Sequence, residues 1–182
     1  MLDERRLLRG ARQSHQQGQG QGPLQRDQAQ ARAFGFIDVL HDEFTGIALD
    51  INGPTISYTA LTGTTQTSNR TLNATISDPS GVASGATAPR VYFRKNAGSY
   101  FSTGCTGAGP AYTCTIDHSL VGGVLAPDVI DYFVIAQDNA GNVSANPSAG
   151  LVAANVNTVT TPPTTPNTYS IVPPFPVSVN VG

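Results

Sequence analysis

The sequence predicts an all-β protein, an antiparallel sandwich of about seven strands. Three observations indicate this fold. Apolar residues recur at every second position in several short segments, turn residues separate these segments at spacings of roughly a dozen residues, and the strongest segment is apolar on both faces. Such a pattern is typical of two sheets that pack face to face over a shared core.

The strongest segment is residues 129–137, VIDYFVIAQ. Side chains alternate between the two faces of a strand, so Tyr132 and Val134 share one face while Phe133 and Ile135 share the other. Bulky apolar groups on both faces predict a central position in the sheet. Tyr132 stands where sandwiches often place a tyrosine whose hydroxyl bonds back to the chain. The DNAGN sequence that follows predicts a tight hairpin turn.

The other expected strands show the same alternation over shorter stretches. In residues 71–77, Leu72, Ala74 and Ile76 alternate with polar neighbours, and Asp78 with the Pro-Ser-Gly after it predicts a turn. The remaining segments with strand character are residues 55–59, 90–95, 99–103, 112–116 and 151–159.

Composition divides the 182-residue chain into three parts. Residues 1–49 form a low-complexity leader that we expect to be disordered, because it cannot bury enough apolar surface. Its last part, residues 34–49, is apolar enough for either a strand or a helical turn. Residues 50–159 form the predicted sandwich. Residues 160–182 begin with TTPPTTPNT, which predicts an extended linker, and then alternate like the start of a following module.

Charge is sparse and unevenly distributed. The formal net charge is −2, and residues 1–50 hold six of the ten basic residues and seven of the twelve acidic ones. This argues against a nucleic-acid partner, because such binding needs a concentrated basic surface. We expect no membrane span, since no run of about 18 apolar residues occurs. Few charges and many Thr, Ser, Gly and Asn residues are typical of an extracellular or cell-surface module.

The two cysteines predict a disulfide. Cys105 and Cys114 are separated by TGAGPAYT, whose two glycines and proline indicate a hairpin loop. A disulfide across the base of such a hairpin is geometrically easy, and an extracellular location would favour it. Two free thiols on a loop are the alternative. A zinc site is less consistent with the sequence, because two cysteines would leave half of the tetrahedral shell empty.

Four segments together carry a resemblance to a known class of module. They are PTISYT, NRTLNATISDPSGV, VYFRKNAGSYFS and, above all, DVIDYFVIAQDNAGN. With these segments, residues 54–159 resemble the immunoglobulin-like or fibronectin-III-like modules of large secreted bacterial surface proteins, particularly those of Bacteroidetes. The resemblance implies an immunoglobulin-like sandwich, a fold that hosts many unrelated functions. The absence of tryptophan and the closeness of the two cysteines depart from antibody domains.

Polar turn residues after two of the expected strands suggest a metal site. In a sandwich of this topology the second and the penultimate strands end at the same pole, which would bring Asp78 near Asp138, with Asn139 and Asn142 close by. Calcium binds several oxygen atoms from such short side chains and from loop carbonyls. The alternative is that these Asp and Asn residues only cap backbone amides. We expect no other cofactor.

Catalytic constellations are not recognisable in the sequence, and we expect no enzymatic activity. His118 lies between Asp117 and Ser119, but a Ser-His-Asp site needs its members to converge from separate elements. Neighbours on one strand point to opposite faces, so we expect His118 on the surface or in a loop. Residues 50–159 contain no glutamate for a pair of glycosidase carboxylates, and no phosphate-binding loop occurs.

The sequence therefore predicts a structural or spacer module of a secreted or cell-surface bacterial protein, whose partners are neighbouring domains of the same polypeptide. One alternative is an adhesive module that binds a glycan or a protein through exposed aromatic residues, namely Tyr92, Tyr100 and Phe101. Another is a subunit that assembles by strand addition, with residues 169–181 donated to the sheet edge of a neighbour.

Overall fold

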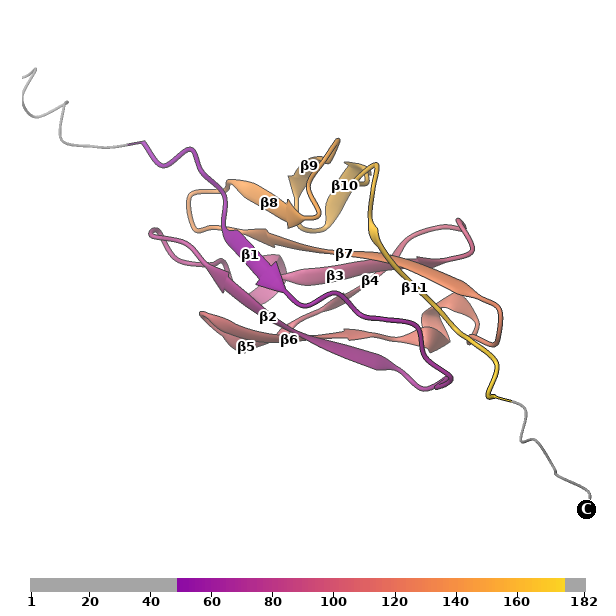
Figure 1. Cartoon of the computed structure of the whole chain (residues 1–182). Helices are drawn as coiled ribbons and strands as arrows, with labels where there is room; N and C mark the ends of the chain where they lie inside the picture. The colour runs from indigo at the N-terminus through magenta and orange to yellow at the C-terminus, as the bar shows by residue number, and fades with distance from the viewer. Residues whose placement is uncertain (1–48, 176–182) are drawn as a thin grey trace, which may run out of the picture. The chain divides into compact units, whose positions relative to one another are not determined.

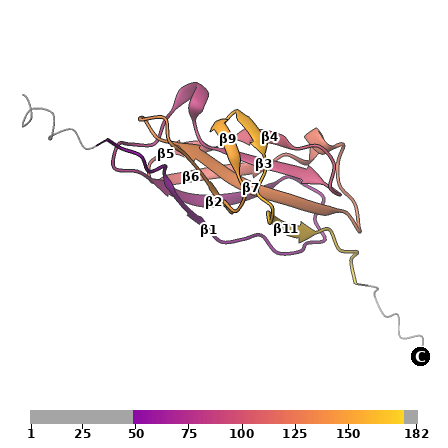
Figure 2. The same ribbon diagram turned by 90° about the horizontal axis from the view of Figure 1, so that it is seen from above.

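A computed structural model describes residues 49–175, and they form a sandwich of two antiparallel β-sheets (Figure 1). The strands of the first sheet are, in spatial order, β1 (Thr55–Tyr58), β2 (Arg70–Ser77), β6 (Ala111–Ile116) and β5 (Thr106–Ala108). The strands of the second sheet are β11 (Asn167–Ser170), β7 (Val129–Gln137), β3 (Arg90–Lys95) and β4 (Phe101–Gly104), and β8 (Val143–Asn146) also pairs with β7. Figure 2 shows the two layers from a second direction.

The core lies between the sheets and follows the two-residue period of the sequence. On β2, Leu72, Ala74 and Ile76 are buried while the residues between them are exposed. Tyr132 and Val134 of β7 meet them from the opposite sheet in the same buried cluster. The predicted all-β sandwich is therefore confirmed, because alternate side chains of facing strands fill one interior.

The expected central position of β7 is also confirmed. Strand β3 pairs along one side of it, and β8 and β11 share the other side. The outer face of β7 is buried as well. Phe133 and Ile135 have no exposed surface and pack with Val156. The residue Val156 belongs to a hairpin of β9 (Val152–Asn155) and β10 (Thr158–Thr161) that covers this face.

The structure differs from the expected boundary at residue 159. The segment expected to be one last strand, residues 151–159, is most of the β9–β10 hairpin. The segment expected to be a linker ends in β11, which pairs with the first half of β7 and buries Tyr169. The prolines that indicated an extended linker instead connect β10 to β11. The described residues thus contain eleven short strands rather than about seven.

The final edge of the second sheet is split between two strands. β8 pairs with residues 134–137 of β7, and β11 pairs with residues 129–132. The β9–β10 hairpin is inserted between them. Beyond β11, the N–H of Ile171 donates to the carbonyl of Asp128 at 2.8 Å. Residues 167–171 therefore complete the sheet of their own chain, whereas the strand-addition hypothesis assigned residues 169–181 to a neighbour.

The predicted disulfide between Cys105 and Cys114 is confirmed. Strand β4 belongs to the second sheet and β5 to the first, so the chain changes sheets at Cys105. Cys114 lies on β6, the partner of β5. The disulfide therefore fixes the crossing chain to the first sheet at the base of the β5–β6 hairpin.

Two short 3₁₀ helices complete the described secondary structure, η1 (Gly85–Thr87) and η2 (His118–Val121). The expected disorder of the leader and the undecided structure of residues 34–48 lie outside the described residues. Residues 176–182, including most of the last apolar alternation, lie outside them too.

Candidate functional site

The turns that follow β2 and β7 meet at one end of the sandwich, as the sequence predicted. The N–H of Ala83 donates to the carbonyl of Gln137 at 2.8 Å, and the N–H of Asn139 donates to the carbonyl of Gly81 at 3.0 Å. These backbone hydrogen bonds hold the two loops side by side although about 60 residues separate them. We call this end of the sandwich the Asp50 pole, after the residue that lies there before β1.

Three carboxylates converge at the Asp50 pole. Asp50, Asp78 and Asp138 each offer an oxygen atom, and these atoms lie within 4.8 Å of one another. Sequence reasoning named Asp78 and Asp138 and missed Asp50. The missed signal was the register of the first hairpin, because Thr55 of β1 lies opposite Ser77 of β2. A residue just before β1 must therefore lie beside the turn that follows β2.

Asp138 is the buried member of this cluster, with 1% of its surface exposed. Its Oδ1 accepts the backbone N–H of Asn142 at 2.7 Å, and its Oδ2 accepts the Asn142 side-chain amide at 2.8 Å. Burial alone would raise the pKa of the Asp138 carboxyl. The donors of Asn142, with the backbone N–H groups of Ala140 and Gly141, outweigh burial and hold the pKa below its usual value.

The asparagines of the cluster mainly build the loops. Asn142 also donates from its side chain to the carbonyl of Asp50 at 3.0 Å, which ties the incoming chain to the turn after β7. Asn139 donates to the carbonyl of Ser80 at 2.9 Å. Asp78 accepts the N–H of Ser80 at 2.8 Å, as a turn cap does. Capping and cation binding are thus compatible, because each Asp keeps a second oxygen or further lone pairs.

No basic side chain within residues 49–175 forms an ion pair with these three carboxylates. The ion pairs of that range are Arg94 with Asp131 at 2.8 Å and Lys95 with Asp128 at 4.0 Å. Carboxylates that face one another repel, and a divalent cation between them would remove that repulsion. Calcium would need further oxygens from loop carbonyls, the Asn side chains or water to complete its six to eight ligands.

The structure separates Phe101 from the other two aromatic residues predicted to bind a ligand, Tyr92 and Tyr100. Tyr92 stacks on Phe133 with ring centroids 5.3 Å apart, and its hydroxyl donates to the carbonyl of Val156 at 2.9 Å. Tyr100 meets the same Phe133 ring edge-on at 5.5 Å. Both tyrosines pack in the cluster beneath the β9–β10 hairpin and are partly buried, whereas we expected from the sequence that they would be exposed. Phe101 is the exposed one, with 42% of its surface accessible.

His118 is buried, in contrast to the surface or loop position expected from the sequence. Only 2% of it is exposed; its Nδ1 lies 3.1 Å from the carbonyl oxygen of Thr67 and its Nε2 2.7 Å from the hydroxyl of Tyr169. Asp117 instead accepts hydrogen bonds from the N–H and hydroxyl of Ser119. The neighbouring Asp, His and Ser therefore have separate structural roles. Sequence reasoning missed this because it placed Tyr169 outside the sandwich.

Tyr132 has the structural role that the sequence predicted. Its hydroxyl accepts the backbone N–H of Leu61 at 2.6 Å. The ring lies 6.3 Å from that of Tyr58 and 5.9 Å from that of Tyr169, measured between centroids. Burial raises the pKa of Tyr58 to about 12 and also raises the pKa values of Tyr132 and Tyr169. These phenols therefore stay neutral and serve as hydrogen-bonding core residues.

Two comparisons of the sequence with known proteins found no match. No protein-family model matches the sequence, and no curated protein matches it. Across residues 49–175, none of the helices has the length and apolar character needed to cross a membrane. The functional inference therefore depends on the geometry of the sandwich itself.

Proposed function

We propose that this chain is a structural module that positions neighbouring domains of a secreted or cell-surface bacterial protein, and that its sandwich is immunoglobulin-like. In such a domain, strands A, B, E and D form one sheet and strands C, F and G the other. The order β1-β2-β6-β5 corresponds to the first sheet. In the second sheet, β3 and β7 correspond to C and F, and β8 and β11 to the two halves of a G strand interrupted by the β9–β10 hairpin.

The observation that carries the proposal is that the described chain enters and leaves at opposite ends of one strand. Asp50 is hydrogen-bonded to Asn142, just beyond the end of β7. Ile171 is hydrogen-bonded to Asp128, just before the start of the same strand. We call the second end the Ile171 pole. The nine residues of β7 place the two poles about 30 Å apart. A sandwich with this arrangement keeps domains attached at the Asp50 pole and the Ile171 pole at a fixed separation.

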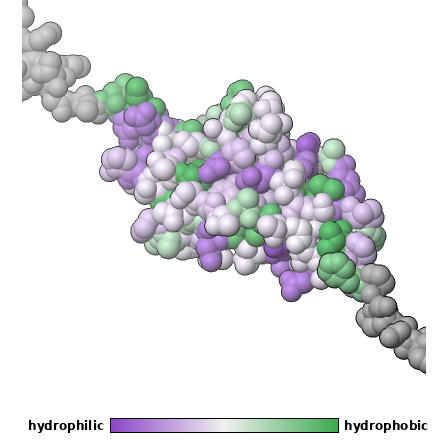
Figure 3. Space-filling model, in the orientation of Figure 1, coloured by the Kyte–Doolittle hydropathy of each residue, from purple (hydrophilic) through white to green (hydrophobic). Residues whose placement is uncertain are grey.

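The surface near both poles supports the same proposal. Exposed apolar side chains lie where the described chain begins and ends (Figure 3). They are Leu49 and Ile51 near the Asp50 pole, and Val172 and Phe175 beyond the Ile171 pole. Such side chains are typical of surfaces that an adjoining domain covers, since interfaces between domains resemble transient protein interfaces.

Two further observations agree with a position outside the cell and with a role other than catalysis. The Cys105–Cys114 disulfide is typical of proteins that fold in an oxidising compartment. The buried imidazole of His118 has both ring nitrogens engaged by Thr67 and Tyr169. A general base needs a ring nitrogen that can reach a substrate, so this histidine serves the fold.

A distance measurement tests the spacer role. Spin labels are attached at Ile51→Cys and Val172→Cys, with the native disulfide intact. Pulsed electron paramagnetic resonance should then give one narrow distance distribution centred at about 30 Å. Labels on Ile51→Cys and Ser80→Cys, both at the Asp50 pole, provide a short-distance control. A broad or bimodal distribution for the first pair would contradict a rigid spacer. Measurable turnover of ester, peptide or glycoside substrates by the full chain would contradict the non-enzymatic role.

A further inference from the structure

The outer face of the first sheet consists almost entirely of small polar side chains. Register and alternation place eleven residues on this face, and none of them is charged or aromatic. They are Thr55 and Ser57 of β1; Thr71, Asn73, Thr75 and Ser77 of β2; Ala111, Thr113 and Thr115 of β6; and Thr106 and Ala108 of β5. We call these eleven residues the hydroxyl face. The second sheet differs, because it carries the charged pair Arg94 and Asp131.

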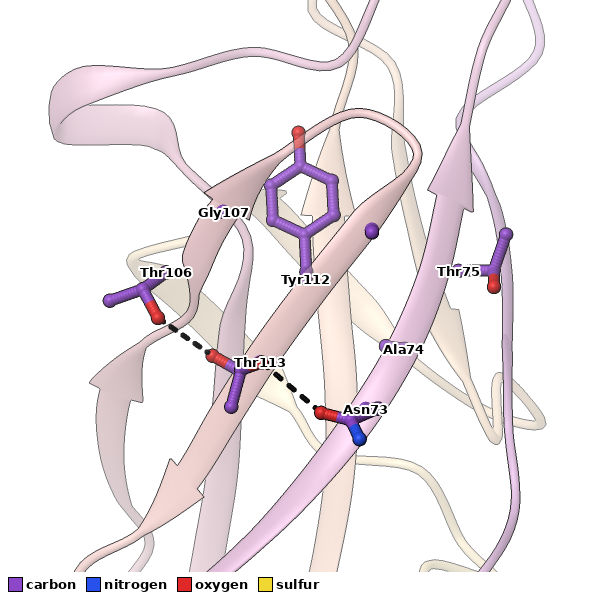
Figure 4. A pocket seen from close by; sticks show the side chains of 8 residues that line it. Asn73, Ala74, Thr75, Thr106, Gly107, Tyr112 and Thr113 are labelled. Carbon is purple, nitrogen blue, oxygen red and sulfur yellow. Dashed lines mark hydrogen bonds between the residues drawn. The ribbon is translucent and has the colours of Figure 1, made fainter.

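A row of hydrogen-bonding side chains crosses the middle of the hydroxyl face. Thr106, Thr113 and Asn73 lie opposite one another on three adjacent strands (Figure 4). The hydroxyl of Thr106 donates to the carbonyl of Thr113 at 3.4 Å, and the hydroxyl of Thr113 donates to Oδ1 of Asn73 at 3.1 Å. This bond leaves the amide NH₂ group of Asn73 as a donor towards solvent, since it has no partner among the described residues.

The row borders a shallow hollow with a volume of about 320 Å³. Its lining includes Thr75 and Ala111, whose side chains are small, and Gly107, which has none, so the floor lies close to the backbone. Gly107 is required there. Its φ is +130°, and a Cβ at this position would lie 2.3 Å from the carbonyl oxygen of Ala111. The hollow is therefore open, and its lining combines hydroxyl, amide and backbone groups with the methyl groups of threonine and alanine.

The size and the charge of the hydroxyl face together indicate its occupant. The four strands have 4, 8, 6 and 3 residues and together cover roughly 330 Å². A second copy packed on the face would bury roughly 660 Å² in total, which is below the ~1,000 Å² expected of a stable protein interface. An anionic polymer or nucleic acid would find no cation to pair with. A neutral polyhydroxylated chain needs neither a large interface nor a cation, because its hydroxyl groups can both donate hydrogen bonds to the face and accept them from it.

We propose that the hydroxyl face binds a neutral polysaccharide, with Asn73, Thr75 and Thr113 as the central contacts. Sugar hydroxyls accept hydrogen bonds from the Asn73 amide. With the hydroxyls of the two threonines they act both as donors and as acceptors. An extended chain follows the flat sheet across the hollow. This inference goes beyond the spacer role and does not depend on it, since a module could hold two domains apart whether or not its sheet face binds a glycan.

Affinity electrophoresis of the full chain tests the proposal. Native gels would contain xyloglucan, glucomannan or dextran as neutral polymers, or polygalacturonate as an anionic one. We expect the migration of the protein to be retarded in at least one of the neutral gels and not in polygalacturonate. Asn73→Ala combined with Thr113→Val should weaken the retardation at least about tenfold, because two or more hydrogen bonds are lost.

A matched control separates binding from folding. Thr161→Val repeats the threonine-to-valine change at an exposed position of β10, outside the hydroxyl face, and should leave the retardation unchanged. Thermal melts of both variants should show the parent fold, since valine is well tolerated in strands. The proposal is overturned by migration equal to that of a non-binding protein in all three neutral gels. It is equally overturned by retardation only in polygalacturonate, or by undiminished retardation of the folded double variant.

Discussion

Thr67, His118 and Tyr169 form a hydrogen-bonded chain that joins three distant segments of the sandwich. The loop before β2 provides the carbonyl of Thr67, η2 provides the imidazole, and β11 provides the phenol. Arg70 lies over the Tyr169 ring, with its guanidinium carbon 4.7 Å from the centroid. At the residue scale, buried polar groups of this kind specify which loops meet, because each would lose its partner in any other arrangement.

Replacing His118 should therefore affect stability. We expect His118→Ala to lower the free energy of unfolding by about 2–4 kcal/mol, because it leaves a cavity and removes the partner of a buried tyrosine hydroxyl. Ser119→Ala, next to it but exposed, should cost about 1 kcal/mol or less. Urea unfolding followed by tyrosine fluorescence would measure both. Equal stability of the two variants would contradict the structural role of the imidazole.

Tyr58 should make the protein sensitive to alkali. Its hydroxyl donates to the carbonyl of Asn146 and accepts the side-chain amide of Asn167. Burial raises the pKa of this phenol from 10.0 to about 12, so the folded state favours the neutral form. The resulting stabilisation is complete below pH 10 and is lost as the pH rises from about 10 towards 12.

The measurement is the urea midpoint as a function of pH. The parent should lose stability between pH 10 and 12, on the order of 2 kcal/mol from this group. Tyr58→Phe should start about 1 kcal/mol less stable, because the two amide groups lose their partner, and should lose less over the same interval. If the stability of Tyr58→Phe fell with pH as steeply as that of the parent, Tyr58 in the folded protein would ionise at the pH of a free tyrosine.

The carboxylates of the Asp50 pole predict a response to calcium. Millimolar calcium should raise the melting temperature, with about 2.7 kcal/mol of stabilisation at a concentration 100 times the dissociation constant. Asp50→Asn and Asp78→Asn should remove the shift. Asp117→Asn, which changes a carboxylate at the end of β6 outside this cluster, should retain it. An unchanged melting temperature in millimolar calcium would leave these residues with the role of turn caps alone.

At the scale of elements, β11 is a short strand on which much of the core depends. It contributes Tyr169, 3% exposed, and leads into Ile171, 1% exposed. A chain that ends at residue 165 would lose both, together with the pairing along β7 and the partner of His118. Each buried side chain is worth about 1.5–3 kcal/mol, so the loss approaches the total stability of a small domain.

We therefore expect the chain ending at residue 165 to be largely unfolded or to aggregate, as seen by circular dichroism and light scattering. A chain ending at residue 175 keeps β11 and is the matched control. It should melt cooperatively, near the temperature of the full chain. If the shorter chain melted at that temperature as well, β11 would be dispensable and the position of Tyr169 in the core would carry little energy.

The elements that could be predicted from the sequence are those whose alternation is local. β2, β3 and β7 match the expected segments to within about one residue, because each has apolar residues at every second position between clear turn signals. The β9–β10 hairpin and β11 could not be predicted in this way. The hairpin packs on the outer face of β7, which carries Phe133 and Ile135, whereas β11 packs in the core between the sheets. The prolines before β11 predict a linker, so the local pattern does not show that the chain returns to the sheet.

The candidate site was predictable to the same extent. Asp78 and Asp138 could be paired because the topology sends β2 and β7 to the same pole. Asp50 required the register of β1 against β2. The hydroxyl face can be recognised in the sequence only after the strand pairing is known, because its members come from four separate segments. Each segment alone shows a few small polar residues, and only the pairing shows that they share one face.

At the scale of the whole molecule, the two sheets are joined along their sides as well as through the core. On one side, the Tyr58 hydroxyl of the first sheet donates to the carbonyl of Asn146 in the second. On the other, the hydroxyl of Thr103 in β4 donates to the carbonyl of Thr115 in β6. The covalent chain also crosses on this second side, at Cys105. The disulfide therefore acts where a strand leaves one sheet and joins the other.

Removing the disulfide should lower global stability without changing the fold. Cys105 and Cys114 are nine residues apart in sequence, and closing a loop of this size is worth about 3 kcal/mol through the entropy of the unfolded chain. We expect Cys105→Ala with Cys114→Ala to lower the free energy of unfolding by about that amount, with an unchanged circular dichroism spectrum. A reducing agent should lower the stability of the parent similarly and leave the double variant unaffected. If reduction affected both proteins equally, its effect would not come from this bond, and the crossing at Cys105 would be held by hydrogen bonds and packing alone.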